Sequence, residues 1–293
     1  MRPEEFLYIR IMDSNLLSNH MIWKYLVIGG ILSLIIAFFA FRLKALAVSG
    51  AVGAVLIGTI VFGFGGILFA VPLIFFFVSS NLLSAIRTAR KDSVINILGK
   101  SGPRDLKQVL ANGAAAAAMV PIYAITGEIF WFFLYLAAVS EAAADTWATE
   151  LGTLSRHRPI SIVTFRKIDP GLSGGVTVLG TLGALAGAVA TAGSGYLTMM
   201  LMNQKMNIAD LAWPVVILFG FIGSLIDSFI GGAWQGQYRC SICGKIVERT
   251  LHCGRETILC RGYRFIGNDL VNFFGTVSGI LLVGLFLKIL IRF

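Results

Sequence analysis

The stretch that decides the fold is residues 128–150, Glu-Ile-Phe-Trp-Phe-Phe-Leu-Tyr-Leu-Ala-Ala-Val-Ser-Glu-Ala-Ala-Ala-Asp-Thr-Trp-Ala-Thr-Glu. At 1.5 Å per residue, a helix of this length crosses a hydrocarbon core roughly 30 Å thick. The stretch also carries Glu141, Asp145 and Glu150, and carboxylates inside a membrane helix are costly and mark functional sites. It therefore predicts a membrane helix with a polar site at one end.

The rest of the chain has the same apolar character. Of its 293 residues, 57% are hydrophobic and 13% are charged, and the mean hydropathy is +0.82, whereas about 25% of the residues in a soluble domain are charged. A water-soluble globular protein is excluded. Alternating strands of about 10 residues are absent, which argues against a transmembrane barrel. We expect an all-α fold, a polytopic transmembrane bundle forming a single membrane domain over 1–293.

Apolar blocks predict about eight spans, with soft boundaries. Residues 1–21 lack a small-residue cleavage site, so we interpret them as a polar leader and not as a signal peptide. Small-residue spacings, as in Gly180, Gly183 and Gly187, predict tight helix packing. The predicted spans are 22–41, 43–63, 65–86, 106–126, 128–150, 174–201, 211–233 and 270–291.

Basic residues fall on one side of the membrane when the loops are sorted alternately. They lie in 42–44, 87–107, 156–167 and 239–264. The positive-inside rule makes this side cytoplasmic and places both termini outside, in a multi-pass protein of the cell membrane. The net charge of +9 then reports topology. We expect the lipid bilayer as a partner and no nucleic acid, and the residues leave a homodimer open.

Five carboxylates fall in the cytoplasmic half of three predicted spans. Glu141 and Asp145 share one helical face because they are four residues apart. Acids at one depth, beside loops rich in Arg and Lys, have the composition expected for magnesium plus phosphates. The alternative is that the acids merely pair with loop cations or hydrogen-bond across helices. The five are Glu141, Asp145, Glu150, Asp227 and Asp269.

A Gly-rich turn precedes the predicted span at 174–201. The segment 164–177, Thr-Phe-Arg-Lys-Ile-Asp-Pro-Gly-Leu-Ser-Gly-Gly-Val-Thr, sets two cations before glycines that open a helix. Backbone N–H groups in such a turn bind oxyanions, although the Walker A spacing is missing. An ordinary cap and loop is the competing interpretation. The turn predicts phosphate binding by Arg166, Lys167, Ser173, Gly174, Gly175 and Thr177.

All the cysteines lie in one loop, 236–268, which we expect to be cytoplasmic and which the family resemblance described below implies to be an insertion. The pattern combines Cys-x2-Cys-Gly with a later His-Cys-Gly. Stable disulfides are disfavoured in the cytoplasm, and thiolates at these spacings are typical of a closed, structural zinc site. Free thiols remain the alternative. Four ligands are expected from Cys240, Cys243, His252, Cys253 and Cys260.

The motif Glu141-Ala-Ala-Ala-Asp145-Thr-Trp-Ala-Thr-Glu150-Leu-Gly152 resembles the integral membrane family known as domain of unknown function 92. The resemblance extends from about residue 75 through the segments 104–113, 164–177, 224–235 and 268–272. Plant and cyanobacterial members of this family include phytyl-phosphate kinase. The arrangement from Asp145 to Lys167 and the paired glycines is also similar, more distantly, to dolichol and phytol kinases, which use CTP. Ser173-Gly174-Gly175 departs from their Lys-x-x-Glu-Gly loop, which leaves the nucleotide base open.

These resemblances imply transfer of a γ-phosphoryl group from CTP or another nucleotide triphosphate to a phytyl- or geranylgeranyl-type monophosphate. Magnesium would be held by Asp145, Asp227 and Asp269, and Glu141 or Glu150 would contact these ligands without binding the metal directly. Lys167 and the paired glycines would bind the donor. The phosphates or the nucleotide would be oriented by Gln108, Asn112, Asn268 and Asn272. The acceptor phosphate would be held by Arg104 or Arg87.

Two alternatives use the same residues. A transporter or lipid flippase would need polar residues through both leaflets, and the sequence confines them to one. A lipid nucleotidyltransferase would use the same metal and phosphate groups but would release pyrophosphate. The residues alone do not separate it from a kinase.

Overall fold

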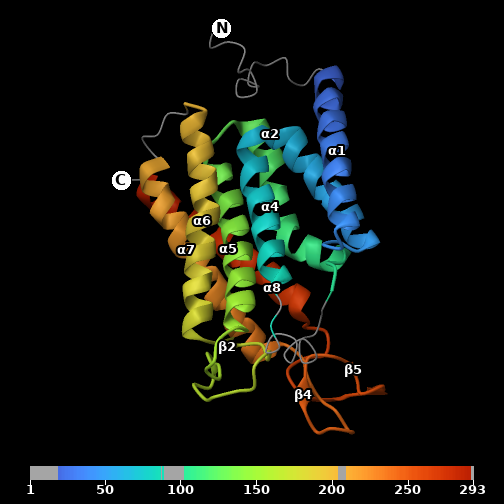
Figure 1. Ribbon diagram of the computed structural model, residues 1–293. Coiled ribbons are helices and arrows are strands. Elements are labelled where there is room, and N and C mark those ends of the chain that lie inside the picture. The colour runs from blue at the N-terminus through green and yellow to red at the C-terminus, as the bar shows by residue number, and fades with distance from the viewer. Residues whose placement is uncertain (1–18, 87, 89–101, 204–208, 292–293) are drawn as a thin grey trace.

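The protein is a bundle of long helices with short strands gathered at one end (Figure 1). The computed structural model describes residues 19–86, 88, 102–203 and 209–291. Most of the predicted leader and Arg87 lie outside the described residues. The helices are α1 (Asn19–Arg42), α2 (Val48–Ala85), α4 (Leu106–Thr126), α5 (Phe130–Gly152), α6 (Val178–Leu201), α7 (Ala209–Trp234) and α8 (Asn268–Ile291).

Among the described residues, 6 helices are long and apolar enough to cross a membrane, namely every long helix except α5. Large apolar side chains cover their outer faces. On α1, for example, Trp23, Ile31 and Phe38 are each more than half exposed. A lipid environment buries such a surface, whereas water does not. The predicted helical membrane bundle is confirmed.

Helix α5 forms the centre of the bundle. It packs against α2, α4, α6, α7 and α8, and every residue from Phe132 to Ala144 is buried. A helix that is apolar on all sides is stable only inside other helices. A polar side chain in this stretch, such as Glu141, is consequently held in the protein core and not against lipid.

Helix α2 doubles back on itself. Its 38 residues exceed the length of one membrane crossing, and Gly66 breaks the helix with φ 59° and ψ −156°, a conformation that favours glycine. Gly50 in the first arm packs against Arg104, and Ser84 in the second arm bonds to Glu150. Arg104 and Glu150 are neighbours, so both ends of α2 lie at one end of the bundle.

The arms of α2 correspond to the predicted spans 43–63 and 65–86. The first arm begins later than predicted, at Val48, because 43–47 form a turn in which Lys44 has φ 59° and Leu46 bridges to Arg104. The predicted span at 174–201 likewise begins only at Val178.

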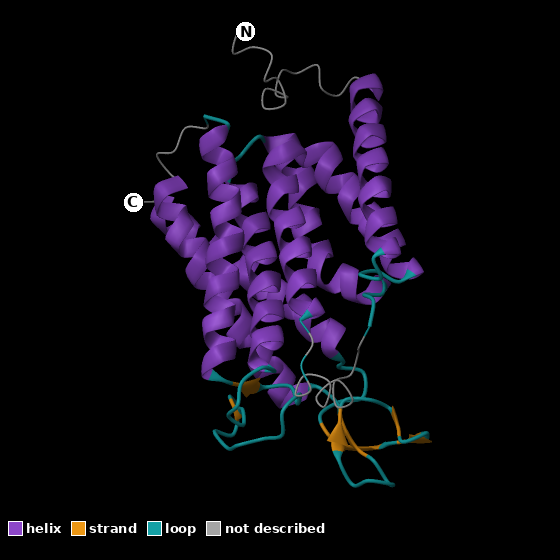
Figure 2. Cartoon of the chain, in the orientation of Figure 1, coloured by secondary structure: helices purple, strands orange, loops and turns teal. Residues whose placement is uncertain are grey.

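The strands gather where α5 and α7 end and where α8 begins (Figure 2). A two-stranded sheet pairs β1 (Ile160–Ser161) with β2 (Gly175–Val176). The Cys-rich loop forms a three-stranded sheet in the order β4-β3-β7 and a separate hairpin, β5-β6. Their bounds are β3 (Gln237–Arg239), β4 (Ile246–Val247), β5 (Leu251–His252), β6 (Arg255–Glu256) and β7 (Ile258–Arg261).

The glycine stripe of α6 lies directly against α5, as its spacing predicts. A Cβ atom on Gly183 would lie 2.9 Å from the carbonyl oxygen of Trp147, and one on Gly187 would lie 2.9 Å from that of Ala143. These neighbours are backbone atoms, which cannot rotate away. The close approach fixes α6, and the turn that precedes it, against the acidic end of α5.

We predict that Gly187→Ala lowers the unfolding midpoint of the detergent-solubilised protein, because overpacking a helix contact costs roughly 1–3 kcal/mol. The matched control is Gly193→Ala in the same helix, where an added Cβ meets nothing within 4 Å. That variant should be neutral or slightly stabilising, since Ala is the better helix former. Equal midpoints for the two variants in thermal unfolding would contradict the close packing.

Candidate functional site

Three carboxylates from two helices meet in the core at the strand-bearing end. Glu141 and Asp145 come from α5, and Asp227 comes from α7. Asp145 and Asp227 lie within hydrogen-bonding reach of each other, and Glu141 adjoins both. Glu141 is 1% exposed and Asp227 is 7% exposed. We name these three residues the acid cluster.

Two oxygens of the acid cluster point to one place. Glu141 Oε1 and Asp227 Oδ2 are buried and have no hydrogen-bond partner among the described residues. Both face Gly275 of α8, where a Cβ atom would lie 2.5 Å from the first and 3.0 Å from the second. Buried carboxylate oxygens are normally satisfied by donors or by a cation. Their convergence fits a divalent cation, with Glu141 beside Asp145 and Asp227.

A polar cleft opens beside the acid cluster. Asp145 and Asp227 line it, together with the Gly-rich turn and the start of α6. Its volume, about 140 Å³, is below the roughly 300–1,000 Å³ of sites that enclose whole small molecules. It therefore suits a phosphate group, with the rest of a ligand outside. Its other polar lining residues are Thr149, Thr153, Ser155, His157, Ser173, Thr177, Thr181, Ser224, Ser228, Glu248 and Asn268.

The Gly-rich turn lies against α7. Gly174 has φ 80°, and a Cβ atom there would lie 2.5 Å from the Cα of Gly232, so this position requires glycine. Gly175 pairs with Ser161, and Thr177 caps α6 by accepting from the N–H of Gly180 at 3.0 Å. The turn thus brings its backbone to the cleft, beside Asp145 and Asp227.

Within the chain, the Gly-rich turn binds the carboxyl group of Glu248. The N–H of Ser173 donates to Oε1 at 2.5 Å, and Nε2 of Gln235 donates to Oε2 at 2.8 Å. Burial raises the pKa of Glu248 to about 7, against the opposing effect of these hydrogen bonds. Sequence reasoning missed Glu248, and the available signal was that it is one of two acids, with Glu256, in a basic loop.

A second polar group, between α4 and α8, lies close to the acid cluster. Nδ2 of Asn272 on α8 donates to Oδ1 of Asn112 on α4 at 3.2 Å, one helical turn from Gly275. Gln108 is engaged elsewhere, because it closes a capping box with Asp105 at the start of α4. The structure thus joins two predicted residues and gives the third a capping role.

Arg104 and Glu150 are neighbours at the same end of the bundle. Burial lowers the pKa of Arg104, and the nearby Glu150 carboxylate opposes that shift. The guanidinium lies 5.9 Å from the ring centre of Phe77, while Glu150 accepts a hydrogen bond from Ser84 at 2.5 Å. Glu150 therefore interacts with Ser84 and Arg104, which are not part of the acid cluster.

Other predicted residues lie away from the cleft lining. Arg166 and Lys167 are exposed on the turn after β1, and neither lines the cleft. Asp269 is half-buried near Asn268 at the start of α8, and only Asn268 lines the cleft. Cations placed before a turn in the sequence need not face the same side as its glycines.

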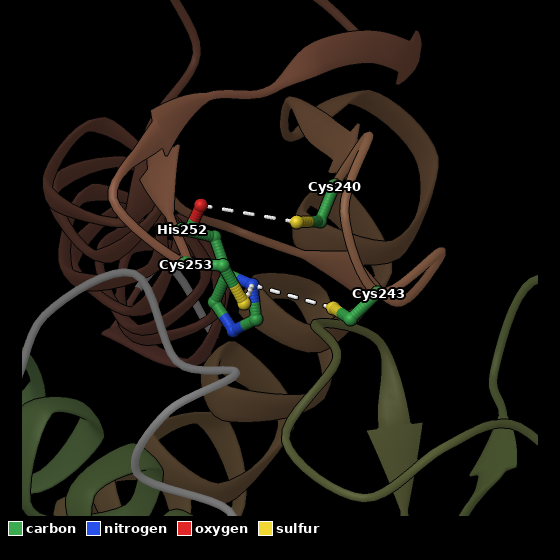
Figure 3. A group of neighbouring side chains, drawn as sticks. All are labelled: Cys240, Cys243, His252 and Cys253. Atoms are coloured by element: carbon green, nitrogen blue, oxygen red, sulfur yellow. Dashed lines mark hydrogen bonds between the residues drawn. The ribbon is translucent and has the colours of Figure 1, made fainter.

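The Cys-rich loop brings together four of its five predicted ligands (Figure 3). One potential ligand atom from each lies within 4.8 Å of the others. Cys260 stands apart, because its Sγ donates to the carbonyl of Gln237 at 3.3 Å. We name the four residues Cys240, Cys243, His252 and Cys253 the Cys/His cluster.

The fold and the site define an integral membrane helical protein with a buried acid cluster beside a phosphate-sized cleft. The chain belongs to the family Integral membrane protein DUF92, which it matches over residues 31–280.

Relatives of this chain occur in plants, archaea and cyanobacteria. Protein PGR of Arabidopsis thaliana is 32% identical over 85% of this chain and 91% of its own length. An uncharacterized membrane protein of Methanocaldococcus jannaschii is 30% identical over 64% of this chain and 73% of its own length. An uncharacterized membrane protein of Synechocystis is 28% identical over 78% of this chain and 88% of its own length. No solved structure matches the chain.

We predict that Glu248→Gln changes how stability depends on pH. The pKa of Glu248 is raised, so the folded protein holds this proton between about pH 4.3 and about pH 7, where the unfolded chain has lost it. The wild type should therefore lose stability relative to Glu248→Gln as the pH rises from 5 to about 7. Unfolding midpoints at pH 5–8 measure this.

The control for this prediction is Glu256→Gln, an exposed acid on β6 of the same loop. Its midpoint should follow the wild type at each pH. A Glu248→Gln profile parallel to the wild type would show that the carboxylate is solvated and not held between Ser173 and Gln235.

Proposed function

We propose that the protein is a membrane kinase that transfers the γ-phosphoryl group of CTP or another nucleotide triphosphate to a polyprenyl monophosphate of the phytyl or geranylgeranyl type. The observation that carries the proposal is the pair of partnerless carboxylate oxygens of Glu141 and Asp227, buried beside a cleft of phosphate size. The family resemblance given above supports the same reaction.

The donor phosphates would enter the cleft. Thr149 and Ser228 line it with their hydroxyl-bearing side chains, and the backbone of the Gly-rich turn borders it. Hydroxyls and backbone amides bind phosphate oxygens without adding charge. The nucleoside would extend past the loop residues at the cleft mouth, among them His157.

The acceptor phosphate would approach from the side of α4 and α8. Asn112 and Asn272 present amide groups there, and Arg104 adds a cation at the same end of the bundle. The acid cluster would then lie beside both phosphates, which must meet directly for transfer. The acceptor is already an anion, so transfer needs positioning and charge neutralisation more than a general base. The isoprenoid chain would lie between apolar helices.

Magnesium would be held by Asp145, Asp227 and Glu141. The carboxylate oxygens suit a hard cation, and the missing side chain at Gly275 leaves their partnerless atoms unblocked. Magnesium supplies neutralisation of the phosphate charge during transfer. The chain's own residues exclude water from the core side and orient both phosphates. The acidic residues and the basic loops favour a cytoplasmic site in the cell membrane.

The test is a transfer assay on detergent-purified protein with magnesium, with CTP, ATP, GTP and UTP labelled at the γ position. Geranylgeranyl and phytyl monophosphate serve as acceptors. We expect label in the prenyl diphosphate and a loss of about a hundredfold or more in Asp145→Asn and Asp227→Asn, because each removes charge stabilisation. Glu128→Gln is the matched control, an exposed acid between α4 and α5, and should retain the wild-type rate.

Three outcomes of this assay overturn the proposal. Release of labelled pyrophosphate, with the nucleotide joined to the lipid, would identify a nucleotidyltransferase. Absence of transfer and of nucleotide binding would favour transport. Wild-type rates in both aspartate variants, folded as judged by gel filtration, would remove the acid cluster from the reaction.

A further inference from the structure

The Cys/His cluster has the geometry of a tetrahedral metal site. Nδ1 of His252 lies 3.5 Å from Sγ of Cys243 and 3.3 Å from Sγ of Cys253. In tetrahedral zinc with Zn–S of about 2.3 Å and Zn–N of about 2.0 Å, ligand atoms are separated by about 3.5–3.8 Å. Three thiols and one imidazole are a ligand set that binds zinc.

The backbone of the cluster has the turns that such a site needs. The N–H of Gly244 donates to the carbonyl of Cys240 at 3.0 Å, and the N–H of Cys240 donates to that of Lys245 at 3.0 Å, which closes the first turn. Cys253 and Gly254 have φ of 53° and 74° and close the second. Figure 3 shows the two turns facing each other.

The cluster also lies on both sides of Glu248 in the sequence. Cys240 and Cys243 stand at the tip of the β3-β4 hairpin, and Tyr238 pairs with Val247 at its base. Glu248 follows directly, and His252 begins the second ligand pair only four residues later. A metal bound to both pairs closes this segment into a short loop, which lowers its conformational entropy.

We propose that Cys240, Cys243, His252 and Cys253 bind one Zn²⁺, and that this zinc holds Glu248 in place against the Gly-rich turn. The site is closed, because four protein ligands leave no position for chemistry. Its effect reaches the cleft through the carboxylate that accepts hydrogen bonds from Ser173 and Gln235. The inference stands on the loop alone and does not depend on the reaction proposed above.

The first measurement is the zinc content of the purified full-length protein by mass spectrometry. We expect about one zinc per chain, lost in Cys240→Ser/Cys243→Ser. The matched control is Cys260→Ser in the same loop, which removes a thiol outside the cluster and should keep the metal. Absence of zinc from the wild type after growth with zinc, or equal content in both variants, would overturn the site.

The second measurement tests the link to the cleft by hydrogen exchange of the peptide that contains Ser173. Removal of zinc from the wild-type protein with a chelator should speed exchange there about tenfold or more, the loss of one charge-assisted hydrogen bond. Glu248→Ala should cause the same increase while zinc stays bound. Unchanged exchange at Ser173 after metal removal would overturn the link. This test uses the wild-type protein, so it does not depend on whether a variant folds.

Discussion

The structure depends on the burial of carboxylates inside a membrane bundle. Taking Glu141 and Asp227 out of water costs several kcal/mol for each charged group unless a proton or a cation compensates. The surrounding helices do not supply a cation among the described residues, and one oxygen of each acid has no partner. A divalent ion would supply both the charge and the missing contacts, which is why we propose the function here.

Close helix packing encloses these buried carboxylates in the core of the bundle. Helix α5 is enclosed by its neighbours, and glycines let α6 and α8 approach its backbone. On α8, Gly275 leaves room at the acid cluster, while on α6 the glycine stripe fixes the cleft wall. The same device therefore provides both rigidity and an opening for a ligand. Loops outside the bundle then complete the cleft.

Sequence reasoning identified the membrane helices, because apolar blocks of span length carry their own signal. It also singled out Glu141 and Asp145, which share a helix face and lie together in the structure, and the two residue pairs of the Cys/His cluster, which are local spacings. It did not identify Glu248, whose role follows from how the β3-β4 hairpin folds back on the turn at Ser173.

Tertiary placement explains the other differences. Lys167 is near the glycines in the sequence but is exposed outside the cleft. The side chain of Gln108 forms a capping box with Asp105 at the start of α4. The role of Gly275 could be seen only after α8 had been placed against α5 and α7. Sequence spacing predicts which residues lie on the same face of one helix. Which residues of different helices contact each other depends on how the helices pack.

The central claim is that the acid cluster binds a divalent cation, and Mn²⁺ binding followed by electron paramagnetic resonance tests it most directly, because Mn²⁺ shares the oxygen ligands of Mg²⁺. The account predicts a bound ion in the wild type that Mg²⁺ displaces. Gly275→Ala should abolish binding, whereas Gly279→Ala, where a Cβ meets only ordinary contacts of 3.4 Å and more, should retain it. Equal Mn²⁺ binding by both variants, or none by the wild type, would contradict the account.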